Sequence, residues 1–110
     1  MQLDSIPWQP TSYAGISVHF YASDRDSKRV LALIRMEPGC GYPAHKHTSD
    51  EELIVVQGGY EDELGRYVKG QLVRYAPGTE HAPRATGAPG SEPCVLLALA
   101  HEGIKLLGGR

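Results

Sequence analysis

Short apolar segments separated by turns run along most of this chain and predict an all-β fold. Between residues 16 and 21, apolar Ile16, Val18 and Phe20 alternate with more polar neighbours, which is the period of a half-buried strand. Residues 30–36 are apolar on both sides in their middle, which predicts a strand that is covered on both faces. We expect the remaining strands at residues 42–47, 51–57, 60–63, 67–69, 71–76 and 94–101.

Glycine and proline mark the connections between these segments. The chain has 13 glycines and 8 prolines, and it has few signals for helix. A hairpin turn is expected at residues 64–66. A long loop is expected at residues 82–93, directly after His81, where it could lie over the mouth of a barrel. A closed antiparallel barrel or jelly roll suits this number of short strands, because closure removes most exposed strand edges.

Composition narrows the classes of function. With 110 residues, the chain is predicted to form a single domain, residues 1–110. A net charge of −2 predicts no binding to nucleic acid, and no apolar run reaches the length of a membrane span. The first residues have neither a basic start nor an apolar stretch, so no signal peptide is expected and the expected location is the cytoplasm. In that compartment, Cys40 and Cys94 are expected to be reduced thiols.

Three histidines and a carboxylate carry the chemistry that the sequence predicts. His45 and His47 are two residues apart, so in an extended strand both side chains point to the same face. A carboxylate at Glu51 or Glu52 can return on the next strand, and His81 follows the turn-forming residues 77–80. Imidazole and carboxylate groups are typical ligands of divalent transition metals. We therefore predict that the chain binds one metal ion at this point.

Spacing alone leaves the carboxylate ligand open between Glu51 and Glu52. The two side chains face opposite ways in a strand, so only one of them can join the histidines. Three residues separate His47 from Glu51, and six separate Glu51 from Gly58. Four residues separate His47 from Glu52, and six separate Glu52 from Gly59, so that count is equally acceptable.

The histidines belong to two longer patterns, Gly39-x5-His45-x-His47-x3-Glu51-x6-Gly58 and Gly70-x7-Gly78-x2-His81. These resemble the two motifs of the cupin superfamily, and more narrowly they are similar to the ChrR-type cupin module. The hairpin at residues 59–67, with Asp-Glu-Leu-Gly-Arg-Tyr at 62–67, fits that subgroup. The resemblance covers residues 28–101 and leaves 1–27 as an N-terminal strand segment. It implies a cupin barrel, a homodimer, and a metal held by His45, His47, Glu51 and His81.

Two positions depart from the usual cupin pattern. Ala76 stands where the second motif commonly has a proline, and Ala85 stands where an asparagine often follows the last histidine. Neither change removes a ligand of the implied metal. Both changes bear on the local shape of the chain around His81.

The identity of the metal separates two hypotheses for function. Iron, manganese, nickel and zinc all suit this ligand set. Four protein ligands fill a tetrahedral zinc, as in structural sites, whereas on octahedral iron, manganese or nickel they leave about two positions open. An open metal supports an enzyme acting on a small molecule, by resemblance a dioxygenase for a chelating diketone or hydroxyketone, with isomerase or lyase chemistry as a variant. A closed zinc supports a non-catalytic ChrR-like sensor or binding module.

The resemblance to ChrR covers the cupin module and not the part of ChrR-type proteins that binds a sigma factor. In ChrR-type proteins a separate N-terminal zinc domain grips the sigma factor. The residues before the first motif are too few for such a domain and hold no cluster of Cys and His, so anti-sigma activity is not expected.

Other candidate pocket residues rest on weaker signals. Arg35 and Tyr75 lie on predicted strands that could line a barrel, where an inward arginine would pair with a carboxylate or enolate substrate. Arg74 and Tyr75 face opposite ways, so at most one of them points inward, and Arg74 is expected on the surface. Asp62 and Glu63 are interpreted as charges beside the hairpin turn.

Overall fold

The computed structural model describes residues 2–24, 26–100 and 104–106, the last three by their backbone alone. It is built almost entirely of antiparallel strands, which confirms the all-β prediction. Its elements are the short 3-10 helix η1 (Leu3–Ser5) and the strands β1 (Gln9–Pro10), β2 (Ile16–Asp24), β3 (Arg29–Met36), β4 (His45–His47), β5 (Glu51–Gln57), β6 (Gly59–Asp62), β7 (Gly65–Val68), β8 (Leu72–Tyr75), β9 (Glu80–His81), β10 (Arg84–Ala85), β11 (Cys94–Ala100) and β12 (Ile104–Leu106).

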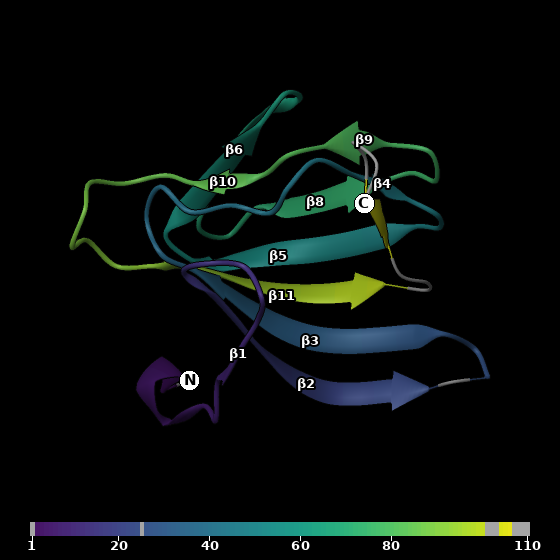
Figure 1. Cartoon of the computed structure of the whole chain (residues 1–110), viewed down its shortest axis with the longest axis horizontal. Coiled ribbons are helices and arrows are strands. Elements are labelled where there is room, and N and C mark those ends of the chain that lie inside the picture. Colours follow the sequence, from purple (N-terminus) through teal and green to yellow (C-terminus); the bar gives the residue numbers. More distant parts are fainter. Residues whose placement is uncertain (1, 25, 101–103, 107–110) are drawn as a thin grey trace.

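A six-stranded sheet forms the body of the molecule, in the order β1-β2-β3-β11-β5-β8 (Figure 1). Strand β11 lies between β3 and β5, with Leu97 opposite Leu33 on one side and Ile54 on the other. Because β11 lies far along the chain from both β3 and β5, the sheet forms only when these distant segments meet. This arrangement is the jelly-roll type of barrel that the strand pattern predicts.

Two smaller sheets complete the barrel, in the orders β10-β6-β7 and β12-β4-β9. The buried core lies between the six-stranded sheet and the β10-β6-β7 sheet, because its members come from both. These core side chains are Ile16, Met36, Leu53, Val55, Tyr60, Val73, Tyr75, Ala85, Cys94, Leu96 and Ala98.

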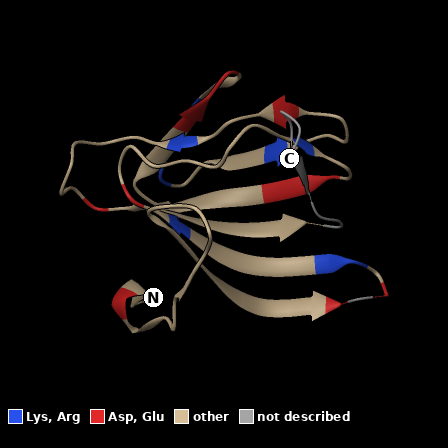
Figure 2. Cartoon of the chain, viewed as in Figure 1, with Lys and Arg blue, Asp and Glu red and all other residues tan. Residues whose placement is uncertain are grey.

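The two faces of the six-stranded sheet differ in their covering. Leu53 and Val73 are paired on the inner face, where both are buried. Ile54 and Leu72 are paired on the outer face, where both are largely exposed. Lys and Arg are scattered among Asp and Glu and do not gather into one basic stripe in this view (Figure 2). Among the described residues, no helix has the length and hydropathy needed to cross a bilayer.

The short elements differ most from the sequence prediction. The hairpin turns at Glu63 and Leu64, whereas the turn was expected at residues 64–66, and Gly65 already belongs to β7. Strands β1, β9, β10 and β12 were not predicted, because a strand of two or three residues is too short to show a period. The predicted strand at 94–101 forms over Cys94–Ala100, and its last position, His101, lies outside the described residues.

Candidate metal centre

Strand β4 presents two histidines to the interior of the barrel. His45 and His47 are buried with 4% and 3% of their surface exposed, and Lys46 between them points the other way. The neighbouring strand β9 pairs His81 directly opposite His45. The third imidazole therefore reaches the first two by strand pairing, across 34 to 36 residues of sequence.

A tight turn sets the register of β9. Pro77 and Gly78 occupy its two central positions, Gly78 has a positive φ of 89°, and the Thr79 N–H donates to the carbonyl of Ala76. Proline followed by a residue with positive φ is the preferred sequence of a type II turn. The Gly78 N–H then donates to the carbonyl of His47. Ala76, which departs from the usual pattern, accepts a hydrogen bond through its backbone and does not prevent the turn.

The ring nitrogens of the three histidines converge. Potential ligand atoms of His45, His47 and His81 all lie within 4.8 Å of one another, a group that could hold a metal ion. The Nε2 atoms of His47 and His81 are 2.9 Å apart. Glu51 lies at the start of β5 and places its Oε1 3.3 Å from Nε2 of His47. Four potential ligands thus approach one point from β4, β5 and β9.

Hydrogen bonds on the far side of the rings set which nitrogen faces this point. Nδ1 of His45 lies 3.0 Å from the carbonyl oxygen of Pro43, which can only accept, so Nδ1 carries the proton. Nδ1 of His81 lies 2.8 Å from Oδ2 of Asp62. Both arrangements leave Nε2 with its lone pair directed at the shared point, which is the form of imidazole that binds metal.

The electrostatics of the group fit a divalent cation. Burial lowers the pKa of His45, and burial together with the other imidazoles lowers the pKa of His47 to about 4, so both rings are neutral near pH 7. Burial raises the pKa of Glu51 to about 7, because the carboxylate has lost its water. Among the described residues that line the cavity, none is a lysine or arginine. A divalent cation would supply the missing positive charge, and neutral imidazoles with a carboxylate are suitable donors for it.

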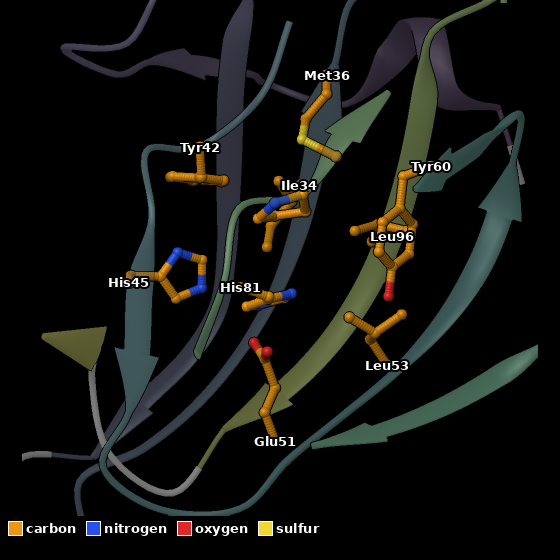
Figure 3. A pocket seen from close by; sticks show the side chains of 10 residues that line it. Ile34, Met36, Tyr42, His45, Glu51, Leu53, Tyr60, His81 and Leu96 are labelled. Atoms are coloured by element: carbon orange, nitrogen blue, oxygen red, sulfur yellow. The ribbon is translucent and has the colours of Figure 1, made fainter. Parts of the chain in front are cut away.

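A cavity of about 160 Å³ adjoins the convergence point (Figure 3). His45, Glu51 and His81 form its polar end, with Glu51 pointing toward the ring of His81 in the close-up view. The rest of the wall is apolar or aromatic and comes from β3, β5, β6, β11 and the segments that carry Tyr42 and Pro83. These lining residues are Ile34, Met36, Tyr42, Leu53, Tyr60, Pro83 and Leu96. Pro83 belongs to the 82–93 loop, so the beginning of this loop borders the cavity, as the sequence suggested.

The structure separates Glu51 from Glu52. Glu51 faces His47, whereas Glu52 points to the outer face and pairs with Arg74, with Nη2 of the arginine 2.7 Å from Oε2 of the glutamate. The expectation that Arg74 lies on the surface is confirmed, since 72% of its side chain is exposed.

Neither Arg35 nor Tyr75, the two candidate pocket residues from the sequence, lines the cavity. Arg35 lies on the opposite face of β3 from Ile34 and Met36 and pairs with Glu37 at 3.1 Å. The alternation of side chains along β3 makes this unavoidable once Ile34 points inward. Tyr75 is buried behind the site, where its ring stacks on His47 with a centroid separation of 5.2 Å and an interplanar angle of 7°.

Asp62 is the site residue that sequence reasoning missed. Its side chain is fully buried, whereas an acidic residue beside a hairpin turn is expected in water. The signal that could have found it is the Asp-Glu-x-Gly-x-Tyr pattern of the hairpin, which also carries the family resemblance. Glu63 also contributes, because its Oε1 accepts the backbone N–H of Ala82, next to His81.

The family of the chain follows from a match over nearly all of its length. The ChrR cupin-like domain family matches residues 1–99. The chain belongs to this family. No curated protein matches it in sequence.

Solved structures share the cupin fold of this ChrR cupin-like chain. An RmlC-like cupin protein from Ralstonia eutropha JMP134 is 20% identical with a TM-score of 0.85, over 96% of this chain and 69% of that one. A chain of the complex of Rhodobacter sphaeroides SigE with the anti-sigma ChrR is 24% identical with a TM-score of 0.76, over 90% of this chain and 50% of that one. An acetylacetone dioxygenase from Acinetobacter johnsonii is 12% identical with a TM-score of 0.82, over 99% of this chain and 77% of that one. At these identities the likeness establishes the fold alone.

Proposed function

We propose that this cupin is a metal-dependent enzyme of the dioxygenase type that acts on a small chelating oxygenated molecule, such as a diketone or hydroxyketone. The observation that carries the proposal is the cavity beside the histidines. His45 and His81 belong to the histidine group, Glu51 lies beside it, and all three line the cavity, so a ligand in the cavity would touch the metal. A purely structural metal needs no such space beside it.

The residues of the chain would divide the work between the metal and the substrate. His45, His47, Glu51 and His81 would hold one divalent ion, iron, manganese or nickel, which supplies Lewis acidity and a template for a bidentate substrate. The apolar wall formed by Ile34, Met36, Leu53 and Leu96 would exclude water and accept the carbon skeleton. Burial raises the pKa of Tyr42 to about 12, so its hydroxyl stays protonated and is available to donate a hydrogen bond at the cavity wall.

The wall also limits the substrate class. No lysine or arginine is among the described residues that line the cavity. A substrate with several negative charges would find no cation besides the metal, so a neutral or singly charged molecule fits better. Cleavage of such a diketone by dioxygen places both oxygen atoms in the products and needs no added reductant.

Oxygen uptake tests the proposal. Protein loaded anaerobically with Fe(II) would be mixed with air-saturated buffer and a panel of diketones and hydroxyketones in an oxygen electrode. We expect substrate-dependent uptake that is absent from zinc-loaded protein and from His47→Ala. Uptake no greater than that of His47→Ala across the panel would reject the dioxygenase.

A non-catalytic binding module with a structural zinc is the second candidate. The membership in the ChrR cupin-like family and the similarity to a chain of the SigE–ChrR complex favour it. X-ray absorption on protein purified without added metal separates the two: zinc bound by four protein ligands without water supports the module, and iron, manganese or nickel with water ligands supports the enzyme. The implied homodimer stays a prediction, which sedimentation velocity would test.

A further inference from the structure

A chain of hydrogen bonds runs from the wall of the cavity to the back of His81. Tyr60 lines the cavity, and its hydroxyl oxygen is 2.6 Å from that of Tyr75. The Tyr75 hydroxyl donates to Oδ2 of Asp62 at 2.6 Å, and Nδ1 of His81 meets the same oxygen at 2.8 Å. All four side chains are buried, so water does not compete for these bonds.

Counting protons fixes the direction of every bond in this chain. A tyrosine hydroxyl has one proton, and that of Tyr75 is used on Asp62, so Tyr60 must donate to Tyr75. Asp62 accepts two backbone N–H groups on Oδ1 and the Tyr75 hydroxyl on Oδ2, a set of donors that suits an ionised carboxylate. An ionised carboxylate can only accept, so Nδ1 of His81 must donate.

The other oxygen of Asp62 is held by the hairpin. Oδ1 accepts the backbone N–H groups of Leu64 at 2.8 Å and Gly65 at 3.1 Å. Four donors therefore surround one carboxylate, two on each oxygen, and these four bonds compensate its charge without a cation. The carboxylate cannot rotate or accept a proton without losing at least one of them.

We propose that Asp62 is the positioning residue of the metal centre: it keeps the proton of His81 on Nδ1, so that Nε2 stays unprotonated and aimed at the metal. This inference rests on the proposed metal site. A carboxylate behind a metal-binding imidazole fixes both its tautomer and its orientation. Asp62 also accepts the hydrogen bond of Tyr75, and the ring of Tyr75 stacks on His47. Through His81 and Tyr75, Asp62 therefore helps to orient two of the three imidazoles.

An asparagine at position 62 cannot reproduce this arrangement. Its amide has one oxygen and one NH2 group, whereas the site offers two donors to each oxygen position. If the oxygen faces the turn, the NH2 group confronts the hydroxyl of Tyr75 and forces His81 to accept through Nδ1. The proton of His81 then moves to Nε2, where it blocks the metal.

The test compares zinc affinity and histidine tautomers in wild-type protein, Asp62→Asn and Asp62→Ala. Zinc affinity is measured by competition with a chromophoric chelator, and the protonated nitrogen of each histidine is read from long-range 1H–15N spectra of the zinc-loaded protein. Glu61→Gln is the matched control, because Glu61 lies one residue earlier on β6 and is paired with Arg66 in solvent. Tyr75→Phe removes one bond to Asp62 but leaves His81 its own.

We expect Asp62→Asn and Asp62→Ala to weaken zinc binding by about 10- to 100-fold. Glu61→Gln should stay within about threefold of wild type, and Tyr75→Phe should lose less than either Asp62 variant. In zinc-loaded wild type, His81 should carry its proton on Nδ1.

Each contrary result has a distinct meaning. A proton on Nε2 of His81 in zinc-loaded wild type overturns the positioning role, even if no Asp62 variant folds. Folded Asp62 variants that bind zinc within threefold of wild type overturn it as well. Wild-type protein that binds no stoichiometric metal contradicts the proposed metal centre itself, which is a different failure.

Discussion

The six-stranded sheet and the histidine corner, by which we mean β4, β9 and the Asp62 end of β6, are built from different kinds of strand. Strands β3, β5 and β11 have seven or eight residues each, and β11 pairs with β3 on one side and with β5 on the other along nearly its whole length. Their inner faces carry most of the buried core. Burial of apolar surface and continuous backbone pairing therefore stabilise this part of the molecule without help from any ligand.

The histidine corner has much less backbone pairing. Strand β4 has three residues and β9 has two. Polar side chains hold these short strands in place, above all Asp62 through His81 and Glu63 through the backbone of Ala82. We infer from this difference that stability depends mainly on the six-stranded sheet and metal binding on the histidine corner. A substitution should therefore be able to change the free energy of unfolding without changing metal affinity, or the reverse.

The largest effect is expected from His47→Ala. This change removes an imidazole whose Nε2 lies 2.9 Å from Nε2 of His81 and 3.3 Å from Oε1 of Glu51, so stoichiometric metal binding should be abolished while the barrel stays folded. Metal content is measured by elemental analysis and the fold by circular dichroism. Lys46→Ala, on the same strand but facing away, is the control and should bind metal normally. Full metal occupancy in His47→Ala would contradict the assigned ligands.

A loss of stability without a loss of affinity is expected from Leu33→Ala. Leu33 is fully buried on β3 and does not line the cavity beside the histidines. The empty space left by its truncated side chain should lower the free energy of unfolding by about 2–5 kcal/mol. Urea unfolding measures this value in metal-free protein. Leu72→Ala, on an exposed position of the same sheet, should change it by less than about 0.5 kcal/mol. Weaker metal binding by folded Leu33→Ala would show that the two regions are coupled.

The same division explains what could be predicted from the sequence. Residues 51–57 were predicted as a strand and form β5 over that range, because a short apolar run between turn residues is a local signal of a buried strand. The shared face of His45 and His47 was also predictable, since a spacing of two is a local property of an extended chain.

The rest of the corner depends on contacts between distant segments. The pattern of apolar and polar residues around Asp62 does not indicate that it is buried, because its partner His81 arrives 19 residues later. The inward direction of Glu51 and the outward direction of Arg35 depend on which face of β5 and β3 meets the core, and spacing alone left both undecided. Strand β9 forms only because Pro77 and Gly78 turn the chain back onto β4.

A moderate effect is expected from metal loading. A metal that binds only the folded state at 100 times its dissociation constant should raise the free energy of unfolding by about 2.7 kcal/mol. Thermal or urea unfolding with and without zinc measures the gain, which should vanish in His47→Ala and persist in Leu33→Ala. An equal gain in His47→Ala would mean that zinc binds elsewhere on the chain.

The smallest effect is expected from the thiol of Cys94, which reports on the sheet alone. Burial raises the pKa of this thiol to about 12, so at pH 8 only about one molecule in ten thousand holds the reactive thiolate, and the side chain is fully buried as well. Half-buried Cys40 should therefore react with iodoacetamide in the native protein while Cys94 reacts only after denaturation. Mass spectrometry of the labelled peptides measures both sites, and Cys40→Ser provides a protein in which only Cys94 can react. Rapid labelling of Cys94 in folded Cys40→Ser would show that the sheet opens readily in the native protein and would contradict its assignment as the stable region.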